Sequence, residues 1–189
     1  VVAPSSKALR ITQDRVLEKS FAREAGIGTV DFYEINSLAD LQSALGQSGL
    51  PALLKTRREG YDGKGQVWIK STEYAGTAYE SLGGRSSILE ARASFTREIS
   101  VVAARGWNGE IKTFPIGENH HVGGILSTTL APAQVSEAVT AEAHEIARKV
   151  LEGMDYVGVL AVELFVLPGD KLLLNEIAPR VHNSDHWTQ

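Results

Sequence analysis

The stretch that decides the fold is YVGVLAVELFVLPGDKLLLNEIAPRVHNSDHW, from Tyr156 to Trp187. Two aliphatic runs within it, Val159 to Val166 and Leu172 to Ile177, have the composition of strands that are buried on both faces. Pro168-Gly169-Asp170 between them favours a turn. The stretch therefore predicts a β-hairpin.

Each predicted strand of this hairpin carries one glutamate, Glu163 on the first and Glu176 on the second. If Gly169-Asp170 is a two-residue loop, Pro168 faces Lys171, and counting back along both strands places the two glutamates opposite each other. A register shifted by one residue would separate them. The pairing predicts two carboxylates on one face of the hairpin.

Two facing carboxylates repel each other and lose hydration on burial, so an apolar hairpin should carry them only where a cation or a shared proton compensates. Mg²⁺ prefers oxygen ligands and commonly links one or two carboxylates to nucleotide phosphates. Asn175 adds a neutral oxygen beside Glu176. The alternative is that one or both glutamates lie at a sheet edge and face water.

The length of 189 residues allows one substantial core or two small lobes that share one. A net charge of -4 and a pI near 5.8 provide no electrostatic footprint for nucleic acid or an anionic membrane. The chain has no apolar run as long as a membrane span and no cysteine, so a reducing compartment and the cytoplasm are expected. Because it starts at Val1 without an initiator Met, we expect a fragment of a longer protein.

Capping residues, periodicity and turn signals predict the other elements. Residues 1–11 are expected to form a connector, with Thr12 capping a helix that ends at Gly26. Asn108-Gly109 predicts a type I′ turn, and no strand is assigned to the small polar stretch around Gly123-Gly124. Strands are expected at 29–35, 51–56, 66–70, 87–91, 96–105 and 110–117, and helices at 37–46, 72–82 and from Ala131-Pro132-Ala133 to Gly153.

The loop from Arg57 to Gln66 has the composition of a phosphate-binding loop, with three glycines and three cations in ten positions. It follows the short strand that ends with Lys55. Glycine lets backbone N–H groups approach an anion closely, and lysines neutralise phosphate oxygens. It is not a Walker A loop, because Lys64 is followed by Gly65 rather than Ser or Thr. The alternative is a mobile, solvated hairpin turn.

Two further acids lie on predicted strands, Glu90 and Glu98. An acid near the end of a strand, such as Glu98, can accept hydrogen bonds from ribose hydroxyls, although an acid on an alternating strand can equally face solvent. Taken in order, the chain offers a lysine at a strand end, a glycine-rich loop, a strand acid and two paired acids. These are the groups needed to hold ATP and Mg²⁺.

Four motifs, LLKTRREGYDGKGQ, REISVVAARG, YVGVLAVELFV and NEIAPRVHNSDHWTQ, resemble those of the ATP-grasp N5-carboxyaminoimidazole ribonucleotide synthetases of purine biosynthesis. The resemblance covers nearly the whole chain. It implies an α+β ATP-grasp fold in which two lobes, at about 29–93 and 94–189, grip the nucleotide between antiparallel sheets. It also implies a ligase that uses ATP to activate bicarbonate as carboxyphosphate and carboxylates aminoimidazole ribonucleotide.

The resemblance also implies roles for individual residues. The bicarbonate, carboxyphosphate or ribonucleotide would contact Arg180, His182 and Asn183, with Arg180 stabilising a developing anion. Mg²⁺ would bind Glu163 and Glu176, beside Asn175. The phosphates of the nucleotide would contact Lys55, Gly60, Tyr61, Asp62, Gly63, Lys64, Gly65 and Gln66. The adenine would contact Glu90, Ala91, Arg92 and Ala93, and the ribose would contact Glu98. His121 matches a histidine of the nucleotide site.

Two residues depart from the family pattern: Asp185 stands where glycine is usual, and Gly123 replaces a polar residue. Family members also carry an N-terminal Rossmann-like domain and a small C-terminal domain that this chain lacks, so we expect weak nucleotide binding and poor turnover in isolation. The resemblance admits a homodimer of the full-length protein and no nucleic-acid or membrane partner. The alternatives are another ATP-grasp carboxylate–amine ligase and a non-catalytic nucleotide-binding module.

Overall fold

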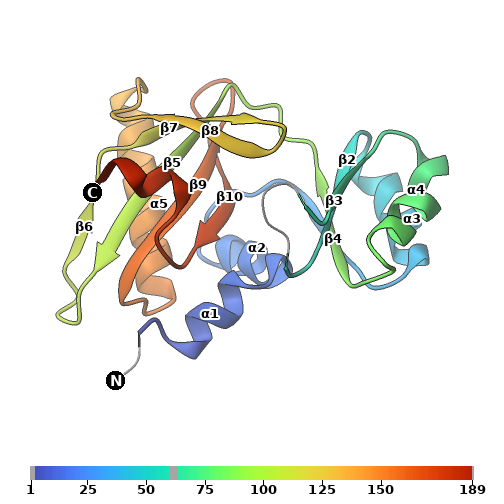
Figure 1. Ribbon diagram of the computed structural model, residues 1–189, viewed down its shortest axis with the longest axis horizontal. Coiled ribbons are helices and arrows are strands. Elements are labelled where there is room, and N and C mark those ends of the chain that lie inside the picture. Colours follow the sequence, from blue (N-terminus) through green and yellow to red (C-terminus); the bar gives the residue numbers. More distant parts are fainter. Residues whose placement is uncertain (1–2, 60–63, 189) are drawn as a thin grey trace.

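Two antiparallel sheets, placed side by side, organise the chain in a computed structural model that describes residues 3–59 and 64–188 (Figure 1). None of the helices in these two ranges is long and apolar enough to cross a bilayer. The helices are α1 (Ser6–Thr12), α2 (Arg15–Glu24), α3 (Leu38–Ser48), α4 (Ala75–Ser81) and α5 (Glu137–Gly153), with 3₁₀ turns η1 (Thr72–Tyr74) and η2 (Asn183–Thr188). The strands are β1 (Phe32–Ile35), β2 (Ala52–Thr56), β3 (Gln66–Ile69), β4 (Ser87–Ala91), β5 (Arg97–Arg105), β6 (Ile111–Thr113), β7 (Gly117–Val122), β8 (Ile125–Leu130), β9 (Gly158–Val166) and β10 (Leu172–Ala178).

The smaller sheet has the strand order β1-β4-β2-β3 and is covered on one face by α3 and α4 (Figure 1). Strand alternation explains how its two faces differ. Ala52 and Leu54 of β2 are fully buried against the helices, whereas Leu53 and Lys55 point to the opposite face. One face therefore forms the core of this lobe, and the other is left to line a cavity.

The larger sheet has the order β10-β9-β5-β7-β8, with β6 also paired to β5. Helix α5 packs on one face through apolar residues such as Val139, Ala143 and Val150. The same alternation holds in β9, where Leu160, Val162 and Leu164 join that core, so that Glu163 points to the other face. Helix α2 lies against β10, at the edge of the sheet.

The β9–β10 hairpin is formed as predicted, but its loop is longer than predicted. Leu167 donates its backbone N–H to Lys171, which leaves Pro168, Gly169 and Asp170 as a three-residue loop, and Asp170 adopts a positive φ of 64°. This loop shifts the register near the turn by one residue, so that Leu172 pairs with Val166. The expectation that Pro168 faces Lys171 is therefore wrong.

A β-bulge at Asn175 reverses this shift. Leu174 pairs with Leu164, but Glu176 pairs with Glu163, so Asn175 is the extra residue in β10. The core pattern changes with it, because Leu174 before the bulge and Ile177 after it both face the core. The two glutamates thus lie opposite each other, as the sequence predicted, although the loop and the bulge that bring them together were not foreseen.

Three local predictions are wrong. The first helical region begins earlier, because residues 6–12 form α1 and Asp14 rather than Thr12 caps α2 by accepting the N–H groups of Val16 and Leu17. The residues on both sides of Gly123-Gly124 form the strands β7 and β8, which the sequence did not predict beyond residue 117, and the two glycines form the turn between them with φ values of 62° and 82°. The Asn108-Gly109 loop has three residues rather than two, since Gly106 donates its N–H to Glu110.

Candidate active site

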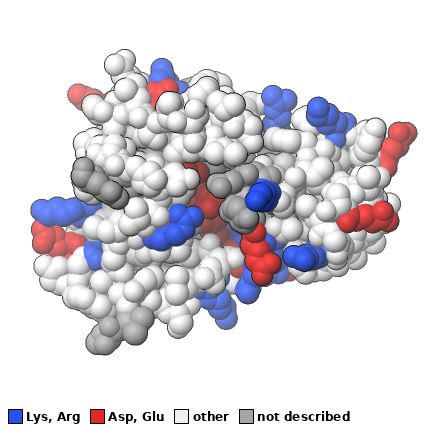
Figure 2. Space-filling model, in the orientation of Figure 1, with Lys and Arg blue, Asp and Glu red and all other residues white. Residues whose placement is uncertain are grey.

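A cavity of about 450 Å³ lies between the two sheets, within the range of small-ligand sites in proteins. Figure 2 shows acidic side chains in the hollow between the lobes and basic side chains around it. Both lobes contribute, since β2 and β3 form one wall and β5, β9 and β10 another. Of the residues expected at the nucleotide, metal and substrate sites, the cavity gathers Lys55, Lys64, Gln66, Glu98, His121, Glu163, Asn175, Glu176, Arg180, His182 and Asn183.

Glu163 and Glu176 both line the cavity. Glu163 is only 9% exposed, and burial together with the charge of Glu176 raises the pKa of Glu163 to about 7. The bulge turns Asn175 toward the same point, with its Nδ2 atom 3.4 Å from Oε2 of Glu163. The alternative in which one or both glutamates face water at a sheet edge does not hold for Glu163, which is buried on the interior strand β9, whereas Glu176 lies on the terminal strand β10.

This pair of carboxylates fits Mg²⁺. In the part of the chain that the structure describes, no three His, Cys, Asp or Glu side chains are grouped closely enough to form a metal cage. Mg²⁺ does not need one, because it keeps several waters and binds one or two carboxylates together with phosphate oxygens. A cation between Glu163 and Glu176 would also remove the repulsion that raises the pKa of Glu163.

The smaller lobe contributes Lys55 to the cavity, and its Nζ lies 2.6 Å from Oε2 of Glu90. Burial alone would raise the pKa of Glu90, but Lys19 and Lys55 outweigh it and lower that pKa to about 2. Glu90 therefore stays ionised and holds Lys55 by its charge. Lys64 and Arg180 add positive charge to the cavity lining.

We expect Glu90→Gln to flatten the acid dependence of stability. A depressed carboxyl pKa contributes stability that is complete above the unfolded value of 4.5 and is lost as the pH falls toward about 2. Between about pH 6 and pH 3, the free energy of unfolding of the unmodified chain should therefore fall by roughly 2 kcal/mol more than that of Glu90→Gln. Urea unfolding at both pH values measures this, with the exposed Glu73→Gln as control. Equal slopes in the two proteins would contradict the pairing.

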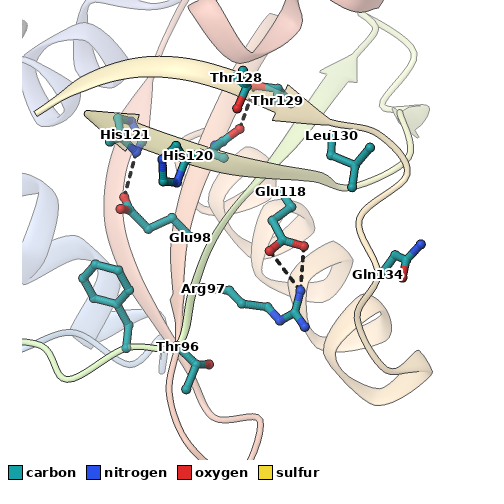
Figure 3. Close-up of a pocket in the computed structure, with 12 residues that line it drawn as sticks. Thr96, Arg97, Glu98, Glu118, His120, His121, Thr128, Thr129, Leu130 and Gln134 are labelled. Carbon is teal, nitrogen blue, oxygen red and sulfur yellow. Dashed lines mark hydrogen bonds and ion pairs between the residues drawn. The ribbon is translucent and has the colours of Figure 1, made fainter.

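Glu98 and His121 point toward each other from neighbouring strands β5 and β7, as Figure 3 shows. Oε2 of Glu98 lies 3.1 Å from Nδ1 of His121, and this contact raises the pKa of the histidine. The pair lies between the 450 Å³ cavity and a neighbouring one of about 860 Å³, which shares both residues. The two side chains offer a hydrogen-bond acceptor and a donor to hydroxyl groups of a ligand.

Apolar side chains complete the walls, and the sequence reasoning missed them. Leu53 and Trp68 are paired on the smaller sheet, and Phe95 stacks on Phe165 of the larger one with ring centroids 4.5 Å apart. Alternation could have found three of them, because Leu53, Trp68 and Phe165 each lie two residues from a predicted polar site residue. Arg15 at the start of α2 also lines the cavity and was missed.

The remaining predicted residues divide into three groups. His182 lies in the cavity with Nε2 3.4 Å from Oε1 of Glu163, next to Arg180 and Asn183. Gly60, Tyr61, Asp62 and Gly63 fall outside the described residues. Gly65, Glu90, Ala91, Arg92 and Ala93 are described but do not line the cavity.

Comparisons with known proteins agree with this geometry. The family model of the ATP-grasp domain matches residues 20–189. The N5-carboxyaminoimidazole ribonucleotide synthase of Brucella melitensis is 45% identical over 191 residues, which cover 100% of this chain and 53% of that protein. The chain thus spans about half the length of the curated relatives it matches.

Solved structures show the same likeness. The ADP complex of an N5-carboxyaminoimidazole ribonucleotide synthetase is 36% identical with a TM-score of 0.93, and the match covers 98% of this chain and 49% of that one. The synthase of Aspergillus clavatus in complex with ADP and 5-aminoimidazole ribonucleotide is 33% identical with a TM-score of 0.90, over 98% and 49% of the two chains.

The α+β fold with two lobes around a cleft, expected from the sequence, is confirmed by the model match and by these structures. The match extends from α2 to the final 3₁₀ turn and includes both sheets and all the residues of the cavity lining except Arg15. The chain belongs to the ATP-grasp family.

Proposed function

We propose that this chain is the ATP-grasp region of an N5-carboxyaminoimidazole ribonucleotide synthase, which carboxylates 5-aminoimidazole ribonucleotide with ATP and bicarbonate. The observation that carries the proposal is the pair Glu163 and Glu176, opposite each other in a cavity that also holds Lys55 and Arg180. Burial beside Glu176 raises the pKa of Glu163, and acids perturbed in this way are common at functional sites. The names of the relatives support the choice among ATP-grasp reactions.

Mg-ATP would lie across the cavity with its phosphates toward the cations and the acids. Lys55, Lys64 and the glycine loop Gly60–Gln66 would hold the phosphates, and Glu163 and Glu176, beside Asn175, would hold Mg²⁺. Glu98 and His121 would bind the ribose hydroxyls. The adenine would lie near Glu90–Ala93, against the apolar walls of Leu53, Trp68 and Phe165.

The chemistry would proceed in two transfers. An oxygen of bicarbonate attacks the γ-phosphorus of ATP, the bond to the β-phosphate oxygen breaks, and ADP and carboxyphosphate form. The 5-amino nitrogen of the ribonucleotide then attacks the carboxyl carbon, loses a proton, and inorganic phosphate leaves. When bound, Mg²⁺ would neutralise charge on the phosphate oxygens. Arg180, His182 and Asn183 would position the anionic reactants, and the guanidinium of Arg180 suits the developing anion.

The proposal extends to the organisation of the whole enzyme. We propose lobes at about 29–93 and 94–189, a full-length protein with further domains on both sides and a cytoplasmic location, and we leave a homodimer as the assembly to test. The relatives are about twice as long as this chain, which supports the further domains. Turnover of this chain should therefore be well below that of a version extended by those domains, and equal turnover would contradict this part.

The test is ADP release in the presence of bicarbonate. We expect release to require bicarbonate and to be stimulated by 5-aminoimidazole ribonucleotide, but not by amino acids or glycinamide ribonucleotide. Stimulation by one of the latter would identify a different ATP-grasp ligase. ADP binding without ADP release by the extended protein would leave a nucleotide-binding module and would overturn the proposal.

We expect Trp68→Ala to weaken ADP binding roughly tenfold, because stacking of a base on an aromatic ring contributes about 1–3 kcal/mol. Trp68 is 47% exposed, so its removal should cost the fold little. Titration calorimetry with ADP measures the effect. Trp107→Ala is the matched control, because Trp107 is also exposed and lies in the β5–β6 loop outside the cavity lining. Equal ADP affinity of the two variants would show that the adenine does not stack on Trp68.

A further inference from the structure

Helix α2 packs against β10, the edge strand of the larger sheet that carries Asn175 and Glu176. β10 is the terminal strand of the sheet, so one side of its backbone has no full neighbouring strand. Before the bulge this side is satisfied by Gly28, whose carbonyl accepts the N–H of Leu174. From Leu174 O to Ile177 N, the backbone around Asn175 and Glu176 instead meets side chains of α2.

Two consecutive residues of α2 make these contacts. Nζ of Lys19 donates to the carbonyl oxygens of Leu174 at 2.9 Å and Asn175 at 2.8 Å. The backbone N–H of Ile177 donates to Oε1 of Glu18 at 2.6 Å. Lys19 therefore binds the backbone just before Glu176, and Glu18 binds it just after.

Both side chains are buried, Lys19 with 1% and Glu18 with 2% of its surface exposed. Burying charges is expensive, and apolar residues of similar volume often stabilise a fold as well or better. Burial and the charge of Glu176 raise the pKa of Glu18 to about 8, which shows that this acid is held in an unfavourable place. The cost is explained if the backbone of the bulge must be held in one conformation.

Lys19 also connects the bulge to the other lobe. Its Nζ lies 3.6 Å from Oε1 of Glu90 on β4, and Oε2 of Glu90 binds Lys55 at 2.6 Å. One buried chain of charges thus runs from the backbone at the candidate metal ligands to the lysine expected to bind phosphate. Lys19 thus touches both the bulge and Glu90.

We propose that Glu18 and Lys19 are positioning residues that hold the β10 bulge so that Glu176 and Asn175 face Glu163, and that Lys19 couples this geometry to Lys55 through Glu90. Neither side chain needs to touch the nucleotide. The role rests on the proposed Mg-nucleotide site, which the two residues would preorganise. Residues that orient metal ligands commonly change metal affinity roughly 10- to 100-fold when mutated.

The first test is the split between metal-dependent and metal-free binding. Lys19→Met should weaken ADP binding in MgCl₂ at least about tenfold, while metal-free ADP binding changes less than about threefold. Titration calorimetry on the whole chain measures both. Arg105→Met is the matched control, because Arg105 also donates to a backbone carbonyl, that of Tyr156, away from the cavity. If both affinities fall in parallel, or if neither falls, the positioning role is overturned.

A pair of Glu18 variants gives a second, conservative comparison. Glu18→Gln keeps an oxygen that can accept the Ile177 N–H, so Mg-ADP affinity should stay within about threefold of the unmodified chain. Glu18→Ala removes the acceptor and should lower that affinity about tenfold. Equal affinities in the two variants would contradict the role of this hydrogen bond.

Hydrogen exchange distinguishes a failure of the positioning role of Glu18 from a failure of the proposed function. Without any ligand, exchange of the Ile177 amide should be at least about tenfold faster in Glu18→Ala than in Glu18→Gln, because only the alanine variant leaves the N–H without its acceptor. If the unmodified chain bound no Mg-ADP, the proposed function would fail, but this measurement would still test whether Glu18 holds the backbone of the bulge. Unchanged exchange of the Ile177 amide in Glu18→Ala would overturn the positioning role of Glu18.

Discussion

Glu176→Gln should abolish Mg²⁺-dependent ATP cleavage while making the ligand-free chain more stable. Loss of one carboxylate ligand removes several kcal/mol of stabilisation from the transferring phosphoryl group, and about 4 kcal/mol corresponds to roughly 10³-fold in rate. The charge of Glu176 raises the pKa of both Glu18 and Glu163. Glu176 also attracts the buried Lys19, so removing its charge should increase the free energy of unfolding near pH 8 by no more than about 1 kcal/mol.

The two opposite effects make this variant informative. Bicarbonate-dependent ADP release should be measured on the protein extended by its flanking domains, and urea unfolding without divalent cations on this chain. Glu142→Gln, an exposed substitution on α5, should change neither. Near-normal ADP release in Glu176→Gln would remove this residue from the metal site, and a loss of stability would show that its charge is already compensated within the chain.

Arg180→Met should lower bicarbonate-dependent ADP release roughly 10²- to 10³-fold, the effect commonly seen when one donor to a developing oxyanion is removed. Arg180 is exposed in the cavity lining, next to His182 and Asn183. Because we assign it to the anionic reactants rather than to the nucleotide, Mg-ADP affinity should change less than about threefold. The steady-state rate and the ADP affinity are the two measurements.

Two further variants sharpen this expectation. Arg180→Lys keeps the charge but lacks the fork of donors that matches a carboxylate or phosphate, so it should restore only part of the rate. Arg148→Met removes an arginine of α5 that pairs with Glu145 and Glu152 outside the cavity, and should leave the rate unchanged. A rate loss explained entirely by weaker ADP binding would contradict the assignment of Arg180.

Local patterns were enough to predict most elements of this chain. Apolar composition, alternation and turn signals located the strands other than β7 and β8, and capping and glycine signals located α3 and α5. The errors occur where a longer-range contact decides. Asp14 rather than Thr12 caps α2 and also binds Arg57, which is 43 residues away in sequence. Asp is a common capping residue, so the local signal existed, but Thr12 offered a competing one and the contact with Arg57 was not visible in the sequence.

The candidate site shows the same division. Its acids, its lysines and Arg180 were found from residue type and resemblance, because charged groups in apolar strands are unusual in any fold. Lys19 and Glu18 were not found. In sequence they look like ordinary polar positions of an amphipathic helix, and only the packing of α2 on the edge of β10 buries them.

The sequence by itself determined that two strands rich in aliphatic residues each carry a glutamate, and that a glycine-rich loop follows Lys55, since these are properties of residue type and spacing. Only the tertiary structure decided that Glu163 and Glu176 meet. The three-residue loop displaces the register by one and the bulge at Asn175 restores it, and the backbone of that bulge is bound by side chains about 160 positions earlier in the chain. A two-residue period along a strand cannot encode such contacts, because they depend on which helix covers the sheet edge.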